Sequence, residues 1–295
     1  MRLPRASSIC RRVVGVFCAV IFAAALQGCT KFQALNATVT TRGYALSRNI
    51  SYGDLSRQKL DVYCPTSAKP NGGIVVFFYG GSWASGEKSG YRFVAQSLTS
   101  RGFIAVLPNY RLYPDVQFPG FVEDGAKAVK WVHDHAAKIG GDPKRVYLMG
   151  HSAGAHIVAL LTLDAHYLKA VGLDRSDIRA PAALSGPFDF VPGPEDCPVF
   201  GLDKSHPRIY PEMEPITFAD GHEPPMLLIH GLLDKTVSPQ NSEELAAKIR
   251  TNGGEVEYLT YPRRAHVGVV LSLAASFRWL APTLYDVTKF FNRYR

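Results

Sequence analysis

Short apolar runs alternate with amphipathic segments along most of this chain. The runs 73–79, 103–107 and 145–149 are rich in β-branched or aromatic residues, and Gly or Pro flanks them. Such runs are typical of strands that are buried on both faces of a sheet. Between about Pro119 and Lys138, apolar residues recur at helical spacing. This alternation predicts an α/β fold with a mostly parallel central sheet and helices on both faces.

The same alternation continues to the end of the chain and supports one catalytic domain over residues 53–295. Further strands are expected at 180–184, 225–230 and 255–261, and further helices at 153–163, 238–250 and 282–293. The exception is the segment 185–224, which is rich in Pro, Gly and acidic residues and has little periodicity. An irregular stretch of that length inside a compact domain is usually functional, so we expect a lid-like insertion that borders the substrate site.

The first residues of the chain have the pattern of a secretory signal peptide. Four arginines, with no acidic residue among them, precede the uncharged run Val13–Leu26, which is followed by Gln27-Gly28-Cys29. The run is too short to span a bilayer, which takes about 20 apolar residues. Without this segment, the formal net charge falls from +8 to +4. The excess charge therefore concerns targeting, and no basic stripe remains that would indicate nucleic-acid binding.

The tetrapeptide Leu26-Gln27-Gly28-Cys29 resembles the bacterial lipobox. The resemblance implies that residues 1–28 are removed, that Cys29 is lipidated, and that residues 29–52 form a tether and lead-in to the domain. Thr30 stands where Asp would favour retention in the inner membrane, which implies an exported lipoprotein anchored in the outer membrane and facing the periplasm. A plain signal peptide, or an uncleaved anchor, is the alternative.

Two cysteines remain after the targeting segment. Cys64 and Cys197 are expected to meet an oxidising compartment, where a disulfide between them is one hypothesis. The sequence holds no CxxC and no His/Cys cluster with the spacing of a zinc site. We therefore expect neither a metal nor another cofactor.

The pentapeptide Gly150-His151-Ser152-Ala153-Gly154 directly follows one predicted strand and opens the next predicted helix. This is the G-x-S-x-G nucleophile elbow, a tight turn that exposes a serine and needs small neighbours so that strand and helix can pack. The alternative is an ordinary tight turn between a strand and a helix. Ser152 is therefore the candidate nucleophile.

A serine nucleophile needs a base, and the base needs a group that orients it. On folds with this elbow the chain order is Ser, acid, His. Asp234 and His266 follow in that order, each just after a predicted strand, so that all three side chains are expected at one edge of the sheet. Ser152, Asp234 and His266 are thus predicted to form a catalytic triad.

Other histidines and acids compete for these roles. His230 lies inside a predicted strand and is expected to be a packed structural residue, whereas a helix that begins at Ala153 would turn His151 and His156 away from the role of base. The remaining competitors are solvated on a helix or less well placed than Asp234: His133, His135, Glu123, Asp124 and Asp189.

Acyl transfer also requires hydrogen-bond donors aimed at the developing oxyanion. One is the backbone N–H of Ala153, immediately after the nucleophile. The others are expected in Tyr79-Gly80-Gly81-Ser82-Trp83, which follows an earlier strand and contains two glycines that permit an open backbone. Gly81 and Ser82 are the predicted donors, and the alternative is that the two glycines only make a turn.

From Leu60 to its C-terminus, the chain resembles α/β-hydrolases of the carboxylesterase and lipase kind. It is similar to the branch with an HGGxW loop, which includes acetylesterases, kynurenine formamidases and prenylcysteine methylesterases. The residues that carry the resemblance are Leu60-Asp-Val-Tyr63, Tyr79-Gly-Gly-Ser-Trp83, Pro108-Asn-Tyr-Arg-Leu112, Gly140-Gly-Asp-Pro143, Gly150-His-Ser-Ala-Gly-Ala-His156 and His230-Gly-Leu-Leu-Asp234. The chain departs from this branch at Tyr79, where the usual residue is a histidine that braces the loop.

These observations predict an exported serine hydrolase that cleaves small carboxylic esters through an acyl-enzyme. Short acyl groups are expected because the irregular segment is polar and holds no long apolar lid. Trp83 and His151 are candidate substrate-pocket residues. One alternative is an amide or formamide hydrolase with the same triad, such as a kynurenine formamidase or a peptidase. Another is a non-catalytic binding protein on a hydrolase fold.

Overall fold

The computed structural model describes residues 35–36, 39–66, 70–203 and 210–295. The expected signal peptide and Cys29 lie outside these residues. The chain separates into a unit over residues 1–38 and a unit over residues 39–295, and the second unit contains the predicted catalytic domain. None of the helices in the described part has the length and apolar composition needed to cross a membrane.

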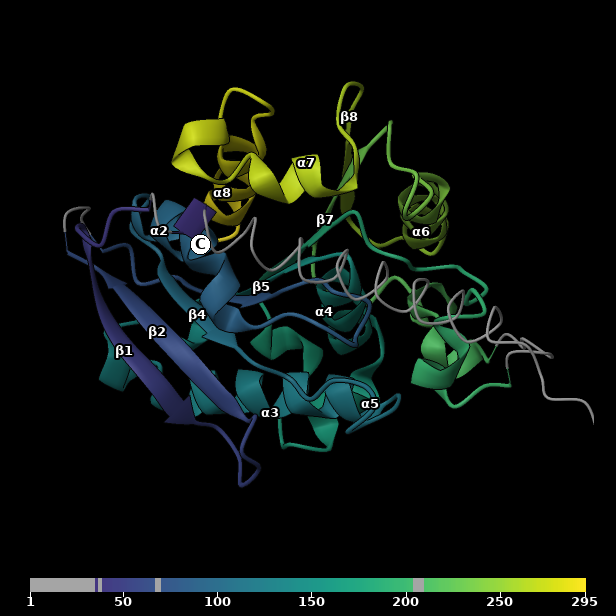
Figure 1. The fold of residues 1–295 in the computed structure, drawn as a ribbon, viewed down its shortest axis with the longest axis horizontal. Helices are drawn as coiled ribbons and strands as arrows, with labels where there is room; N and C mark the ends of the chain where they lie inside the picture. Colours follow the sequence, from purple (N-terminus) through teal and green to yellow (C-terminus); the bar gives the residue numbers. More distant parts are fainter. Residues whose placement is uncertain (1–34, 37–38, 67–69, 204–209) are drawn as a thin grey trace, which may run out of the picture. The chain divides into compact units, whose positions relative to one another are not determined.

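An eight-stranded sheet forms the centre of the second unit, with the strand order β1-β2-β4-β3-β5-β6-β7-β8 (Figure 1). β2 runs antiparallel to both of its neighbours, β1 and β4, and all other neighbouring strands are parallel. The predicted mostly parallel sheet is confirmed. Its strands are β1 (Tyr44–Ser51), β2 (Lys59–Pro65), β3 (Ile74–Phe78), β4 (Ile104–Pro108), β5 (Val146–His151), β6 (Ala180–Leu184), β7 (Met226–Gly231) and β8 (Val256–Tyr261).

The five strands β3 to β7 are buried at every position, as their continuous apolar runs predict. The two edge strands differ from them, because one face of each is open to solvent. β8 is half-buried along most of its length, and in β1 only Tyr44 is buried. The segment 29–52, expected as a tether and lead-in to the domain, contains β1 over Tyr44–Ser51, a strand that the sequence pattern did not indicate because an edge strand needs few apolar residues.

Helices cover both faces of the sheet. α2 (Arg92–Thr99) and α8 (Thr283–Arg293) pack on one face, where Phe291 of α8 contacts Phe103 and Tyr147. The opposite face carries the predicted helices α3 (Gly120–His135), α4 (Ala153–Leu163) and α6 (Gln240–Thr251). The short helices α5 (Ala165–Lys169) and α7 (His266–Leu271) complete the layers. The core therefore lies between the sheet and each helical layer.

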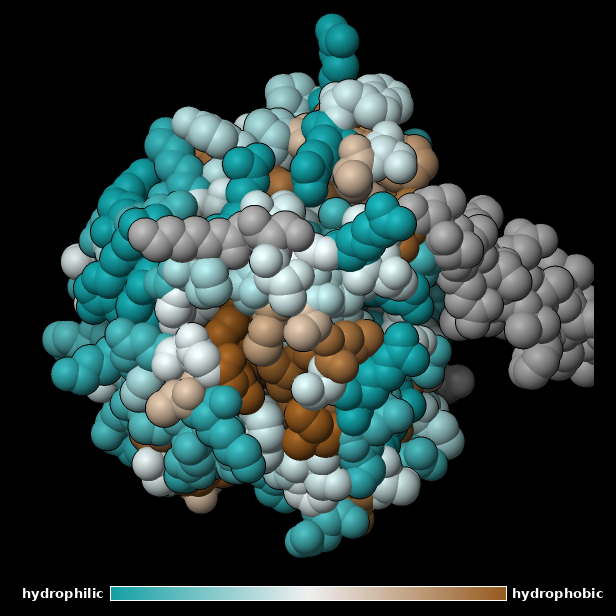
Figure 2. Space-filling view, turned by 90° about the vertical axis from the view of Figure 1, so that its left-hand side faces the viewer, coloured by the Kyte–Doolittle hydropathy of each residue, from teal (hydrophilic) through white to brown (hydrophobic). Residues whose placement is uncertain are grey.

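Figure 2 shows the molecule from the β1 end of the sheet. Hydrophilic side chains cover most of this face, and hydrophobic side chains gather near its centre. The polar pattern of β1, in which three consecutive residues are exposed, agrees with its position at this edge. Exposed polar side chains are one way in which natural proteins protect an edge strand from pairing with another chain.

The segment 185–224 is irregular, as expected, but much of it is packed. Its described residues form short 3-10 turns at Cys197–Phe200, Pro211–Met213 and Pro215–Phe218 and contain neither strand nor α-helix. Phe188 and Met213 are buried, and Asn241 of α6 accepts hydrogen bonds from the backbone N–H groups of Phe188 and Asp189 at 2.7 and 3.0 Å. The insertion is thus fastened to the helical layer.

Cys64 and Cys197 are free thiols, so the disulfide considered for them is not formed. Cys64 lies on β2, and its thiol donates to the carbonyl of Ile139 at 3.6 Å. Cys197 lies buried in the insertion, where its thiol donates to the carbonyl of Pro192 at 3.7 Å. The hypothesis was wrong because each thiol has its own local carbonyl partner and belongs to a different part of the fold.

Candidate active site

Ser152 occupies the turn between β5 and α4, in the strand–turn–helix context that the pentapeptide predicts. Its backbone has φ 56° and ψ −122°, a conformation that costs a non-glycine residue about 1–3 kcal/mol. The turn is possible because its neighbours are small: a Cβ at Gly150 would lie 2.2 Å from the carbonyl oxygen of Gly154. A Cβ at Gly154 would lie 2.1 Å from the carbonyl oxygen of Phe78. The small neighbours therefore allow Ser152, a half-buried residue, to adopt this strained backbone conformation.

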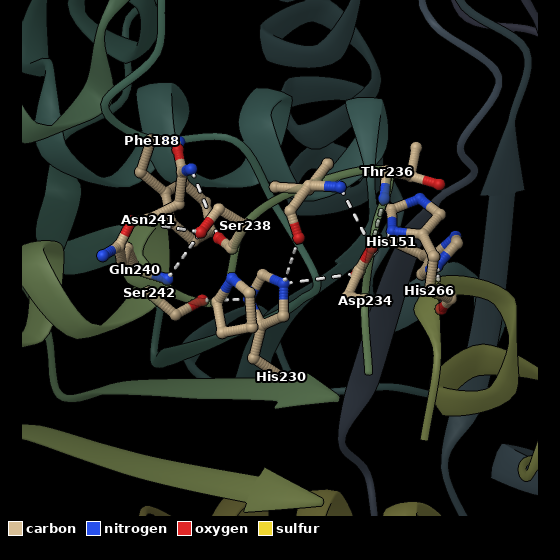
Figure 3. Close-up of polar contacts among 12 residues, drawn as sticks. His151, Phe188, His230, Asp234, Thr236, Ser238, Gln240, Asn241, Ser242 and His266 are labelled. Atoms are coloured by element: carbon tan, nitrogen blue, oxygen red, sulfur yellow. Dashed lines mark hydrogen bonds and ion pairs between the residues drawn. The ribbon is translucent and has the colours of Figure 1, made fainter. Parts of the chain in front are cut away.

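Asp234 and His266 meet at the carboxyl edge of the sheet, where the turns after β7 and β8 pass close to each other (Figure 3). Nδ1 of His266 lies 2.7 Å from Oδ2 of Asp234. A carboxylate only accepts hydrogen bonds, so Nδ1 carries the hydrogen and Nε2 has a free lone pair. The Asp234 side chain is fully buried, whereas that of His266 is 12% exposed. The imidazole of His266 is thus held by a buried carboxylate while part of its ring stays accessible.

Backbone donors hold the other oxygen of Asp234. Oδ1 accepts hydrogen bonds from the N–H groups of Thr236 at 2.9 Å and Val237 at 3.0 Å. Burial alone would raise the pKa of Asp234, but hydrogen bonds from His230, His266 and Val237 hold that pKa well below its usual range. Asp234 is therefore ionised near neutral pH and can stabilise a positive charge on His266.

His230 is buried and hydrogen-bonded at both ring nitrogens, as expected for a packed residue. Nε2 donates to the carbonyl of Val237 at 3.1 Å, and Nδ1 lies 2.7 Å from the hydroxyl of Ser242. Nε2 also lies 3.3 Å from Oδ2 of Asp234. This contact with the acid was not predicted, although a spacing of four residues across the turn after β7 is compatible with it. His230 thus helps to place Asp234.

His151 is buried behind the ring of His266, with ring centroids 4.8 Å apart. Nε2 of His151 donates to the backbone carbonyl of His266 at 3.1 Å. Burial lowers the pKa of His151 to about 3, so that it is neutral near pH 7. This placement agrees with the expectation that His151 is not the base. The contacts of His151 support the position of His266, and its predicted place in the substrate pocket stays a prediction.

The loop 79–86 lies directly against the nucleophile. A Cβ at Gly80 would lie 2.9 Å from the Cβ of Ser152. The carbonyl of Gly81 accepts hydrogen bonds from the N–H groups of Ala84 at 3.1 Å and Ser85 at 2.9 Å. In a trans peptide the next N–H, that of Ser82, points the opposite way. Within the described part of the chain, no hydrogen bond engages the N–H of Gly81 or of Ser82, which leaves both as free donors.

Trp83 belongs to an aromatic cluster that joins this loop to the insertion. Its ring stacks on Phe121 and Phe190, with centroids 6.0 and 6.1 Å apart, and Phe200 meets it edge-on at 4.9 Å. His156 of α4 also meets Trp83 edge-on, at 5.1 Å. Trp83 is only 4% exposed. The insertion therefore supplies two aromatic residues, Phe190 and Phe200, beside the loop.

The remaining competitors have other partners. Asp124 is fully buried and forms an ion pair with Arg111 at 2.9 Å, and it accepts a hydrogen bond from Gln58 at 2.7 Å. Nε2 of His156 donates to the carbonyl of Met213 at 2.8 Å, and burial lowers its pKa to about 4. Glu123 and Asp189 are exposed, whereas His133 and His135 are half-buried on or near the end of α3. Across the residues that the structure describes, no group of His, Cys, Asp and Glu side chains is arranged to hold a metal ion.

An elbow serine and an acid–histidine pair at the carboxyl edge of a mostly parallel sheet define an α/β-hydrolase. Solved structures share this fold. Esterase B from Lactobacillus rhamnosis has a TM-score of 0.76 at 20% identity, with 95% of each chain covered. A truncated carbohydrate esterase from gut microbiota has a TM-score of 0.75 at 21% identity, with 86% of this chain and 98% of that chain covered.

The chain belongs to the BD-FAE family, whose model matches residues 60–249. Curated relatives include a probable isoprenylcysteine alpha-carbonyl methylesterase from Arabidopsis thaliana, 29% identical over 245 residues, which are 76% of this chain and 51% of the relative. Esterase LipC from Mycobacterium tuberculosis is 28% identical over 275 residues, 85% of this chain and 66% of the relative. The chain thus spans about half to two thirds of the length of these relatives.

Proposed function

We propose that the protein is a serine esterase that hydrolyses carboxylic esters. The observation that supports the proposal is the 2.7 Å hydrogen bond between His266 Nδ1 and Asp234 Oδ2, since the turn that carries Ser152 follows a strand of the same parallel part of the sheet. The relatives and structural neighbours named above are called esterases, which favours an ester over an amide as the substrate.

In the proposed mechanism, Nε2 of His266 takes the proton of the Ser152 hydroxyl as its oxygen attacks the ester carbonyl. Asp234 stabilises the imidazolium that forms. The N–H groups of Gly81, Ser82 and Ala153 donate to the oxyanion. His266 then gives its proton to the leaving alcohol, and a water molecule, activated by the same histidine, releases the acid from the acyl-enzyme.

Short acyl groups fit this site best in the proposal. The aromatic cluster around Trp83 fills the space between the 79–86 loop and the insertion, and Phe200 in that cluster is itself buried. An acyl chain that extended into this region would have to displace packed rings. Hydrolysis rates along a series of p-nitrophenyl esters are therefore expected to fall as the acyl chain lengthens.

The decisive variant is Ser152→Ala, made in a chain that begins at residue 30. It should lose hydrolysis of a short p-nitrophenyl ester, because the nucleophile is gone, and it should keep its thermal unfolding transition. Labelling with a fluorophosphonate probe should disappear in the same variant. Unchanged turnover by Ser152→Ala would refute the mechanism, and an unlabelled, inactive wild-type protein would favour a binding role instead.

We further propose that the full-length protein is exported and held at a membrane by a lipid on Cys29. The support is the lipobox-like sequence that ends at Cys29, after a basic start and an uncharged run. Incorporation of labelled fatty acid in a bacterial host should be seen for the wild type and lost in Cys29→Ser. A Cys29→Ser variant that still carries the label would contradict this assignment.

A further inference from the structure

The loop 79–86 lacks the histidine that usually braces it, and an arginine from a distant part of the chain contacts it instead. Arg57 lies between β1 and β2. Its Nη2 donates to the hydroxyl of Tyr79 at 3.0 Å and to the carbonyl of Gly86 at 2.6 Å. Its Nε donates to the carbonyl of Tyr110 at 2.7 Å. One guanidinium therefore holds both ends of the loop and fixes them to the segment after β4.

Tyr79 is fixed at its side chain and at its backbone. Its ring is fully buried between those of Tyr91 and Tyr110, with centroid distances of 5.6 and 4.6 Å. Its hydroxyl donates to Oδ1 of Asn109 at 3.2 Å, and its carbonyl accepts a hydrogen bond from the hydroxyl of Tyr110 at 2.7 Å. Tyr79 can thus transmit the position of Arg57 to the residue that follows it.

The residue that follows is Gly80, which lies against Ser152. The other anchored residue, Gly86, also contacts the start of the loop: a Cβ there would lie 2.9 Å from the Tyr79 ring and 3.0 Å from the carbonyl oxygen of Gly80. A shift of Tyr79 or Gly86 would therefore move the N–H groups of Gly81 and Ser82 relative to the nucleophile. Positions of such donors matter at the scale of a few tenths of an ångström.

Arg57 forms no ion pair within the described residues, so its charge is not there to neutralise a carboxylate. Its partners are two carbonyl oxygens and one hydroxyl, which lie in different directions. A planar guanidinium can donate to all three at once, whereas the ammonium group of lysine is a compact point charge on a flexible stem. The contribution of Arg57 to the loop is therefore the arrangement of its three hydrogen bonds, and not its charge alone.

We propose that Arg57, acting through Tyr79 and Gly86, is a positioning residue that sets the oxyanion donors of Gly81 and Ser82. This inference rests on the proposed esterase function. It assigns to an arginine and a tyrosine the bracing role that the family resemblance implies for a histidine. Arg57 does not touch the reacting atoms, and its effect is confined to how well the donors meet the developing oxyanion.

The test compares Arg57→Lys and Tyr79→Phe with the wild type on a short p-nitrophenyl ester. Because the donors remain but are displaced, kcat should fall about tenfold or more in each variant, less than the 10²–10³-fold that loss of a donor costs. KM should stay within about threefold, because ground-state binding is not what a shifted oxyanion donor weakens. The rate of inactivation by a phosphonate, which mimics the tetrahedral intermediate, should fall in step with kcat.

The matched control is Arg175→Lys. Arg175 also makes two short hydrogen bonds, to Asp220 at 2.7 and 2.9 Å, but these lie on the surface and contact no part of the loop. This variant should keep the wild-type kcat. The double variant Arg57→Lys/Tyr79→Phe should lose little more than either single variant, because residues that act through one contact are not additive.

Wild-type kcat in both Arg57→Lys and Tyr79→Phe would overturn the proposal, as would losses that match the fraction of unfolded protein or appear only in KM. The two proposals fail in different ways. If the wild type is inactive, or Ser152→Ala is active, the esterase mechanism is refuted. If the wild type is active, Ser152→Ala is inactive and the two loop variants behave as wild type, only the role of Arg57 is refuted. Should Arg57→Lys not fold, Tyr79→Phe alone decides.

Discussion

Replacing Asp234 by asparagine would reverse the hydrogen bond that orients the imidazole of His266. Oδ1 of Asp234 accepts two backbone N–H groups, so only the amide oxygen of an asparagine fits on that side. Its NH2 group must then face His266 Nδ1, which lies 2.7 Å from the present Oδ2. Two donors cannot face each other, so Nδ1 must become the acceptor and Nε2 must carry the hydrogen. The nitrogen that should accept the serine proton would then be blocked.

We therefore expect kcat of Asp234→Asn to fall on the order of 10³- to 10⁴-fold, as a reversed tautomer does in serine hydrolases. That loss corresponds to about 4–5.5 kcal/mol of transition-state stabilisation. Folding should suffer much less. The two backbone hydrogen bonds are kept, and the contact that is lost, at 3.3 Å from His230, is long. The free energy of unfolding should fall by no more than about 3 kcal/mol.

The assay is steady-state hydrolysis of a short p-nitrophenyl ester, with urea denaturation measured on the same samples. The matched control is Asp189→Asn, which makes the same chemical change at an exposed acid of the insertion and should retain activity. A loss of less than tenfold in Asp234→Asn, or a larger loss in Asp189→Asn, would show that the orienting acid is misassigned.

Two further predictions concern stability. Burial lowers the pKa of His151 to about 3 and of His156 to about 4, against 6.5 in the unfolded chain, so the unfolded state binds these protons first as the pH falls. Each of these two histidines should reduce the free energy of unfolding by about 1.4 kcal/mol per pH unit between pH 6.5 and its folded pKa. Urea denaturation from pH 7 to 4.5 would measure this loss, and a flat profile of stability against pH would contradict it. Gly154→Ala should destabilise the protein by about 3 kcal/mol, because its Cβ would meet the carbonyl oxygen of Phe78 at 2.1 Å; an unchanged melting temperature would show that the elbow can relax.

The central part of the fold could be predicted because burial on both faces leaves a clear sequence pattern. β3 to β7 are continuous apolar runs, and Ser152, Asp234 and His266 each follow a predicted strand, β5, β7 and β8, of the parallel part of the sheet. The edge strand β1 was missed because solvent covers most of its residues, so that Tyr44 is its only buried side chain. The short helix α7 was also missed, since its six residues directly follow the turn that carries His266.

Contacts that join distant parts of the chain explain what the sequence did not reveal. The 79–86 loop was found from its glycines, but nothing near it in the sequence points to Arg57, which the pairing of β1 with β2 carries there. The contact of His230 with Asp234 depends in the same way on the path of the turn after β7. The disulfide hypothesis was wrong because a count of cysteines does not show which segments of the chain lie next to each other.

The attachments of the 185–224 insertion have a consequence for how substrate range can change. It is held by Asn241 of α6, by the carbonyl contact of His156 with Met213, and by the hydrogen bond from Phe118 to Val199. It is also tied to the sheet, because the N–H of Ser185 donates to the carbonyl of Ile229 on β7 at 2.9 Å, and Phe188 and Ala219 share a buried cluster with Ala183 and Leu228. Exchange of the whole segment would therefore remove buried contacts of the core, whereas exchange of the residues between these attachment points would not. The attached residues of this segment are therefore constrained by folding stability, and sequence change is left to the stretches between them.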